Sequence, residues 1–226
     1  MQDFSGASCP LPTVVRIEFS GETPVRSFGD LVAGLPHGGE VVLDPLRAPG
    51  VAAGPGYRAQ AEYWTERLAA EDGPFVVLGY CSGANLALAL ASALRAAGRE
   101  VSTIGLFDPI TFTLAQVREV AVEIAAALDP TGDAELCPLP ANRETAVPNL
   151  LSFVGEVLDA ALGDLPEDTR AQLLTRYAAW IGYSLSATEP VAAPAGVDIH
   201  VFASDDLIAG APGSSWGAPR QLGGSG

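Results

Sequence analysis

A glycine-flanked turn between an apolar run and an apolar helical pattern constrains this chain more than any other feature. Phe75-Val76-Val77-Leu78 is continuously apolar, as in a strand buried on both faces of a parallel sheet. Gly79-Tyr80-Cys81-Ser82-Gly83 follows directly, and a helical pattern continues over 82–97 until Gly98 stops it. A tight strand-to-helix turn of this kind exposes its central side chain at the helix N-terminus. We therefore predict a strand, a strained turn and a helix here.

Strand and helix patterns alternate along much of the chain. Apolar or β-branched runs predict further strands over 13–19, 40–43, 101–107 and 197–203. Helical spacing of apolar residues lies between some of them, over about 28–35 and 57–70. Such alternation is characteristic of a mostly parallel, doubly wound sheet. We expect one α/β domain over 1–226, in which the helical segments 114–128, 147–162 and 166–183 form a lid insertion at about 113–186.

Composition and charge exclude several classes of protein. The 12 basic and 27 acidic residues give a formal charge of -15, which repels nucleic-acid phosphates and anionic lipid surfaces. The longest apolar stretch, 84–94, is about half a membrane span. The first ten residues include Asp3 and lack a basic start, unlike a secretion signal. We expect a cytoplasmic protein without a nucleic-acid or membrane partner.

The cysteines point away from structural cross-links. Cys9, Cys81 and Cys137 have no CxxC spacing, which argues against a disulfide framework and against a zinc site. Cys81 instead stands at the centre of the turn, where a helix N-terminus favours negative charge, so we predict a lowered pKa and a nucleophilic thiolate. The alternative is that Cys81 is a small buried apolar residue, as most free cysteines are.

An oxyanion hole would complete this site. The backbone N–H of Ser82 is the expected first arm. The second arm should come from the loop after the first strand, near Phe19, Ser20 or Gly21, and we assign it to Ser20.

Beyond the turn, Ala97-Gly98-Arg99-Glu100-Val101 and Gly105-Leu106-Phe107-Asp108 add to a family pattern. With them the chain resembles the thioesterase domains and stand-alone thioesterases of nonribosomal peptide and polyketide assembly lines, with cysteine replacing the usual serine. The resemblance implies an α/β-hydrolase fold. It also implies that Asp108, at the end of the strand after the nucleophile helix, is the acid of a catalytic triad. The alternative is that Asp108-Pro109 only begins a turn.

The triad histidine is the departure from the family pattern. His37 and His200 are the two histidines of the sequence, whereas the family's histidine falls well after the last strand. His37 should lie at the edge opposite the strand C-termini. His200 is the remaining candidate for the base, although a core or sheet-face position suits it better. Either the base has been lost or the sequence is truncated before it; Asp205 and Asp206 could supply an alternative acid, but a loop cap is the better interpretation.

The resemblance also implies a reaction and its partners. An acyl or aminoacyl group would pass from an acyl or peptidyl carrier protein, presented on a phosphopantetheine arm, onto Cys81 for transfer, cyclisation or hydrolysis. No metal or other bound cofactor is implied. An acidic carrier would require a local basic patch, around Arg95 and Arg99 or Arg170 and Arg176. The alternative function is a catalytically impaired binding or scaffold module that retains the fold.

Overall fold

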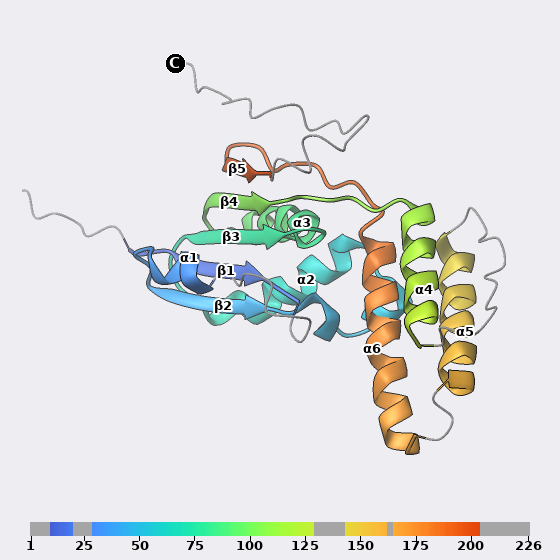
Figure 1. Cartoon of the computed structure of the whole chain (residues 1–226). Coiled ribbons are helices and arrows are strands. Elements are labelled where there is room, and N and C mark those ends of the chain that lie inside the picture. The colour runs from blue at the N-terminus through green and yellow to red at the C-terminus, as the bar shows by residue number, and fades with distance from the viewer. Residues whose placement is uncertain (1–9, 20–28, 129–142, 162–164, 204–226) are drawn as a thin grey trace, which may run out of the picture.

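The computed structural model describes residues 10–19, 29–128, 143–161 and 165–203. Their strands form a five-stranded parallel sheet of order β2-β1-β3-β4-β5 (Figure 1). The strands are β1 Thr13–Ile17, β2 Gly39–Leu43, β3 Phe75–Tyr80, β4 Val101–Phe107 and β5 Asp198–Phe202. The parallel α/β sheet predicted from the alternating pattern is therefore confirmed.

Helices cover both faces of this sheet. On one face α1, Gly29–Ala33, packs through Val32 against Val14 and Leu78. On the other face lie α2, Tyr57–Arg67, and α3, Gly83–Ala96. Three leucines of α3 recur every fourth residue and are fully buried in the main core, at Leu86, Leu90 and Leu94, and Leu88 is buried there too. The sheet is thus doubly wound, as expected.

Three long helices separate β4 from β5. They are α4 Leu114–Leu128, α5 Arg143–Ala161 and α6 Glu167–Ser186. Figure 1 shows them side by side, across the carboxyl ends of the strands. They share a second apolar cluster that includes Val117, Leu150, Val157 and Ile181. The helical insertion predicted from the sequence is therefore present, and it has a core of its own.

The C-terminal half of α6 joins this insertion to the main domain. Ala179, Tyr183 and Ala187 belong to the main core. Gly182 faces a short 3-10 helix, Val51–Ala53, for which the sequence analysis predicted no element. A Cβ atom at Gly182 would overlap the Val51 carbonyl oxygen, so the close approach of α6 requires glycine at this position.

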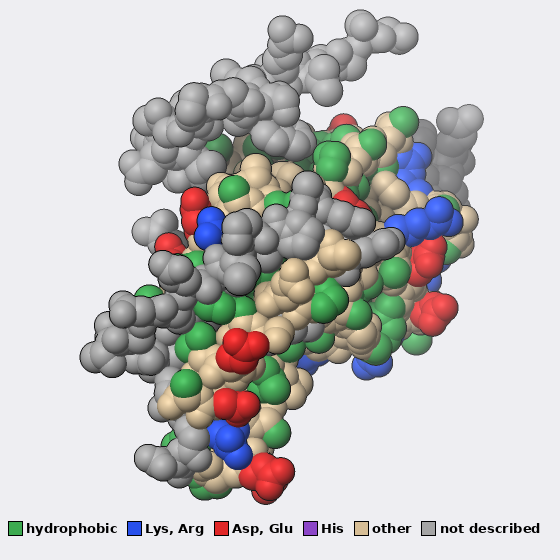
Figure 2. All heavy atoms as spheres, turned by 90° about the vertical axis from the view of Figure 1, so that its right-hand side faces the viewer, with side chains coloured by type: hydrophobic (Ala, Val, Ile, Leu, Met, Phe, Trp, Pro, Cys, Tyr) green, Lys and Arg blue, Asp and Glu red, His purple; other side chains and the backbone are tan. Residues whose placement is uncertain are grey.

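The outer surface of the inserted helices is mixed in character. Figure 2, which faces this side, shows acidic, basic and apolar side chains interspersed among the described residues. Within the described ranges, no helix combines the length and the apolar character needed to span a membrane.

Candidate active site

Cys81 directly follows β3 in a left-handed backbone conformation. Its φ angle is 54°, which residues other than glycine rarely adopt. Its N–H donates to the Phe107 carbonyl at 2.8 Å, and its carbonyl accepts from the Ala84 N–H at 3.1 Å. These hydrogen bonds hold the turn between the neighbouring strand and the first turn of α3. The strained strand-to-helix turn predicted from the sequence is therefore confirmed.

The two glycines of the turn allow α3 to approach the sheet. A Cβ atom on Gly79 would lie 2.8 Å from Ala84 Cα and 2.9 Å from Ala87 Cβ. At Gly83 a Cβ atom would lie 3.1 Å from a methyl carbon of Ile17. Larger residues at either position would push the helix away from β1 and β3. The two glycines thus set the distance between the turn that carries Cys81 and the sheet.

The ionisation of the Cys81 thiol differs from the sequence prediction. Burial raises the pKa of Cys81 above its ordinary value, and the charge of Asp108 raises it further. Hydrogen bonding from the Ser82 backbone N–H and hydroxyl lowers the pKa, but by less. The prediction of a lowered pKa is therefore wrong, because desolvation of the thiolate outweighs the donors at the start of α3.

Asp108 occupies the matching position at the end of the next strand. Phe107, the last residue of β4, pairs with Tyr80, so Asp108 and Cys81 leave adjacent strands at the same level. Asp108 also has a left-handed backbone, with φ 45°, and its N–H donates to the Phe202 carbonyl at 2.7 Å. The structure thus brings Asp108 beside Cys81, within range of a direct electrostatic interaction.

Ser82 is buried beneath the turn, with 1% of its surface exposed. Its carbonyl accepts a hydrogen bond from the Tyr57 hydroxyl at 3.1 Å. Ser20, our candidate for the second oxyanion arm, lies outside the described residues, as do Gly21, Asp205, Asp206, Cys9 and Cys137. Of the two proposed oxyanion arms, the structure therefore describes only the residue that carries the first.

An aromatic cluster supports the turn from below. Tyr57, at the start of α2, and Tyr183, on α6, are fully buried with ring centroids 6.1 Å apart. Phe19, just after β1, meets Tyr183 at 5.2 Å and Trp180 at 5.3 Å, both edge-on. Burial raises the pKa of Tyr183 well above its ordinary value, so this phenol stays protonated. The contact of Tyr57 with Ser82 was not predicted, because no local signal in the sequence links residues so far apart.

The histidines are not joined to this site by any contact within the described ranges. His200 lies on the edge strand β5 in register with Gly105, and it is exposed. Gly105 in turn pairs with Leu78, three residues before Cys81. His37 precedes β2, at the amino ends of the strands. The predicted placement of His37 is confirmed, and the exposed position of His200 on the sheet agrees with the sheet-face interpretation.

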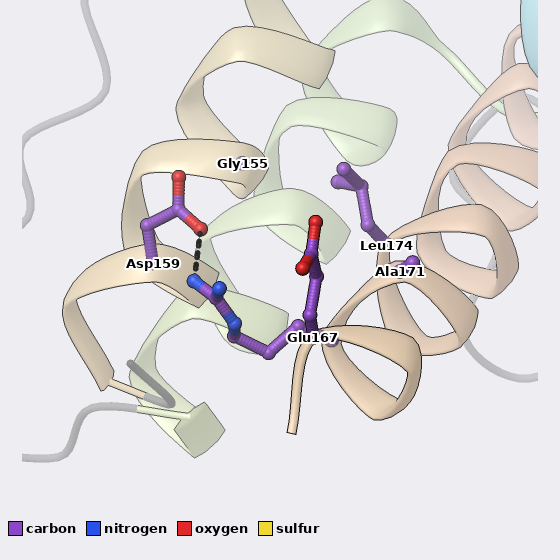
Figure 3. A pocket seen from close by; sticks show the side chains of 6 residues that line it. Gly155, Asp159, Glu167, Ala171 and Leu174 are labelled. Atoms are coloured by element: carbon purple, nitrogen blue, oxygen red, sulfur yellow. Dashed lines mark hydrogen bonds and ion pairs between the residues drawn. The ribbon is translucent and has the colours of Figure 1, made fainter. Parts of the chain in front are cut away.

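The arginines considered for a carrier-binding patch make internal contacts. Arg99 donates to the Leu68 carbonyl at 3.4 Å and covers the Phe75 ring, 5.0 Å from its centroid. Arg95 donates to the Ala195 carbonyl. Arg170 pairs with Asp159 at 3.3 Å, at a cavity of about 170 Å³ between α5 and α6 (Figure 3). These three guanidinium groups therefore tie parts of the fold together.

Surface cavities formed by the described residues include one between α5 and α6 and one beside β2 and α2. The one between α5 and α6 is also lined by Glu167 and Leu174 (Figure 3). A larger cavity of about 570 Å³ lies beside β2 and α2, and its lining includes Arg47, Trp64 and Arg67. Neither of these two cavities is lined by Cys81 or Asp108.

A parallel α/β sheet with a left-handed strand-to-helix turn at the end of β3 and an aspartate at the end of β4 is the arrangement of a hydrolase-type α/β domain. The chain matches the family described as Thioesterase domain over residues 61–206, more than half its length, and it belongs to that family. It is also similar to one of the subunits of mycosubtilin synthase from Bacillus subtilis, with 43% identity over 79 residues, or 33% of this chain and 3% of that protein. The chain thus matches a very small part of this curated relative.

Solved structures with a similar fold have low sequence identity to this chain. The type II thioesterase BorB from the borrelidin biosynthetic cluster is 18% identical, with 87% of this chain and 74% of that chain covered and a TM-score of 0.49. The NocB thioesterase domain, in a covalent complex with a fluorophosphonate nocardicin G analog, is 17% identical, with coverages of 84% and 71% and a TM-score of 0.44.

Proposed function

We propose that this chain takes an acyl or aminoacyl group from a carrier-protein thioester onto Cys81, and then passes it to water or to another nucleophile. The observation that carries the proposal is the left-handed turn that presents Cys81 at the start of α3, beside Asp108. Family membership supports thioester chemistry. The similarity to part of a mycosubtilin synthase favours a role in nonribosomal peptide or polyketide biosynthesis.

Acyl capture is a thioester exchange. The Cys81 thiolate attacks the acyl carbonyl carbon, the bond from that carbon to Cys81 Sγ forms, and the bond to the pantetheine sulfur breaks. The pantetheine thiolate leaves and takes up a proton equivalent to the one that Cys81 lost. Because an acyl-cysteine is itself a thioester, the two states are nearly isoenergetic and the exchange is reversible. Cysteine therefore suits transfer, whereas serine would hold the group as an ester.

The oxyanion of the tetrahedral intermediate requires donors. The Ser82 backbone N–H already hydrogen-bonds with the thiol region, and it is the first donor in our proposal. We assign the second to the loop that begins at Ser20. Phe19 and Trp180, which pack edge-on against each other, are candidates for the wall of the acyl site.

Ionisation of the thiol controls the capture step. Since burial and Asp108 raise the Cys81 pKa, only a minor fraction of the protein carries a thiolate at neutral pH. Capture should therefore accelerate as the pH rises toward the raised pKa. Deacylation by water needs a general base near the acyl carbon. Among the described residues, Asp108 is the charged group that acts on Cys81, and His200 lies exposed on β5. Because no histidine of the described residues is in place to activate water, the acyl-enzyme should persist.

The competing function is a binding or scaffold module, which the raised thiol pKa and the exposed position of His200 favour. Acyl-pantetheine and acyl-carrier thioesters separate the two functions. A catalytic chain gains the acyl mass on the Cys81 peptide, and a Cys81→Ala variant does not. Binding of the carrier without any acylation over a range of pH would favour the scaffold.

A further inference from the structure

We propose that Asn85 is a positioning residue, whose side-chain amide holds the loop after Asp108 against the nucleophile turn. This role deepens the proposed function and rests on it, since it matters for catalysis only if Cys81 and Asp108 belong to the reacting site. Its geometry depends only on the contacts described below.

Asn85 joins α3 to the loop that follows β4. It lies in the first turn of α3, four residues after Cys81, and only 4% of its surface is exposed. Its Nδ2 atom donates to the Ile110 carbonyl at 3.2 Å and to the Thr111 hydroxyl oxygen at 2.9 Å. One amide group thus satisfies two acceptors in consecutive loop residues.

The backbone closes the same connection from the other side. The Ile110 N–H donates to the Cys81 carbonyl at 3.3 Å, and the Asp108 N–H donates to the Phe202 carbonyl. Segment 108–111 is therefore tied to the nucleophile turn through Cys81 and Asn85, and to β5 through Phe202. A non-glycine residue in the left-handed region is strained, and it persists only where its surroundings enforce it. These ties enforce it at Asp108, whose φ is 45°.

Few other side chains could make this connection. The asparagine amide offers two N–H donors on one atom, and both acceptors here are oxygens. An ionised aspartate at position 85 could only accept, and it would face the Ile110 carbonyl. Alanine would leave the Ile110 carbonyl and the Thr111 hydroxyl oxygen without the Asn85 donor, so the loop would lose both side-chain ties to α3.

A double-mutant cycle on the Cys81 pKa tests this role without requiring turnover. The pKa is measured from the pH dependence of iodoacetamide alkylation, in a background with Cys9→Ala and Cys137→Ala. The titratable groups described as acting on Cys81 are Asp108 and Tyr183, and Tyr183 stays protonated. Asp108→Asn removes the negative charge and should lower the pKa. In an Asn85→Ala background the loop loosens, and Asp108→Asn should lose most of its effect.

Matched variants separate positioning from general damage to α3. Ser92→Ala removes a hydroxyl on the same helix that donates to the Leu88 carbonyl at 2.9 Å, and it should leave the full Asp108 effect. Thr111→Val, at an exposed position, removes one of the two acceptors and should reduce the effect partially, so the test remains available if Asn85→Ala does not fold.

Two results would overturn the inference. One is an Asp108→Asn shift that is equally large with and without Asn85, or with and without the Thr111 hydroxyl. The other is the absence of any Asp108 effect on Cys81. Failure of the proposed function has a different signature, namely no acyl adduct on Cys81 while the cycle behaves as predicted.

Discussion

Asp108 lies beside Cys81 at the carboxyl ends of adjacent strands, and its negative charge opposes ionisation of the Cys81 thiol. In a catalytic triad the acid acts on the nucleophile through a histidine that it orients. In this protein the Asp108 carboxylate interacts directly with the Cys81 thiol. Burial is the larger cause of the raised Cys81 pKa, and the charge of Asp108 adds to it. Together they keep the thiol protonated at neutral pH.

The first prediction concerns this charge. Asp108→Asn should lower the Cys81 pKa and increase alkylation at pH 7 several-fold, because a like-charge interaction with the thiolate is removed. Rates of iodoacetamide labelling across pH, resolved by peptide mapping, measure the change. Asp198→Asn, at the exposed start of β5, is the matched control and should have no effect. Slower labelling of the Asp108 variant would contradict the prediction.

The second prediction concerns the docking of α6. Gly182→Ala forces a methyl group into the Val51–Ala53 backbone and should destabilise the protein by about 1–3 kcal/mol, or more if α6 detaches. Gly155→Ala, inside α5, meets only Leu174 Cδ1 at 3.9 Å, and it should stabilise by about 0.5–1 kcal/mol. Urea unfolding monitored by circular dichroism compares the two. Equal changes in the free energy of unfolding for the two variants would mean that the docking of α6 does not depend on its close contact with the 3-10 helix Val51–Ala53.

The third prediction separates the two halves of α6. Ala179, Tyr183 and Ala187 belong to the main core, whereas Val117 of α4 and Leu150 of α5 belong to the second cluster. Helices α4 and α5 should therefore open locally before β3 does, and the end of α6 should exchange as slowly as the sheet. Native-state hydrogen exchange resolves these segments. Protection of α4 equal to that of β3 would indicate one rigid body rather than a lid.

Local patterns predicted the parts of this fold that are encoded locally. The apolar run at Phe75 and the two flanking glycines predicted β3, the turn and α3, and Leu114–Leu128 was predicted as a helix with the observed bounds. The short 3-10 helix Val51–Ala53 was missed, because its three residues carry no periodicity. Its role emerges only from contact with Gly182.

The site depends more on long-range packing, and there the sequence was less informative. The position of Cys81 followed from spacing, but burial and the charge of Asp108 raise its pKa, so a helix N-terminus alone predicted the wrong direction. The contacts of Tyr57 with Ser82 and of Asn85 with Thr111 join residues about 25 positions apart, and no local pattern links them. The position of Asp108 was predicted from the family resemblance, which places the acid at the end of the strand after the nucleophile helix.

The proposed function depends on a covalent acyl group at Cys81. We expect that intact-mass and peptide analysis at moderately alkaline pH, with a set of acyl-pantetheine and acyl-carrier thioesters, will show one acyl group added on the peptide that contains Cys81. The adduct should decay slowly, since no histidine is joined to the described site. Cys81→Ala should abolish the adduct, and Cys81→Ser should form it far more slowly because an unassisted hydroxyl is a poor nucleophile. Wild-type protein that never gains acyl mass at Cys81, or a Cys81→Ala variant that gains as much, would contradict the proposal.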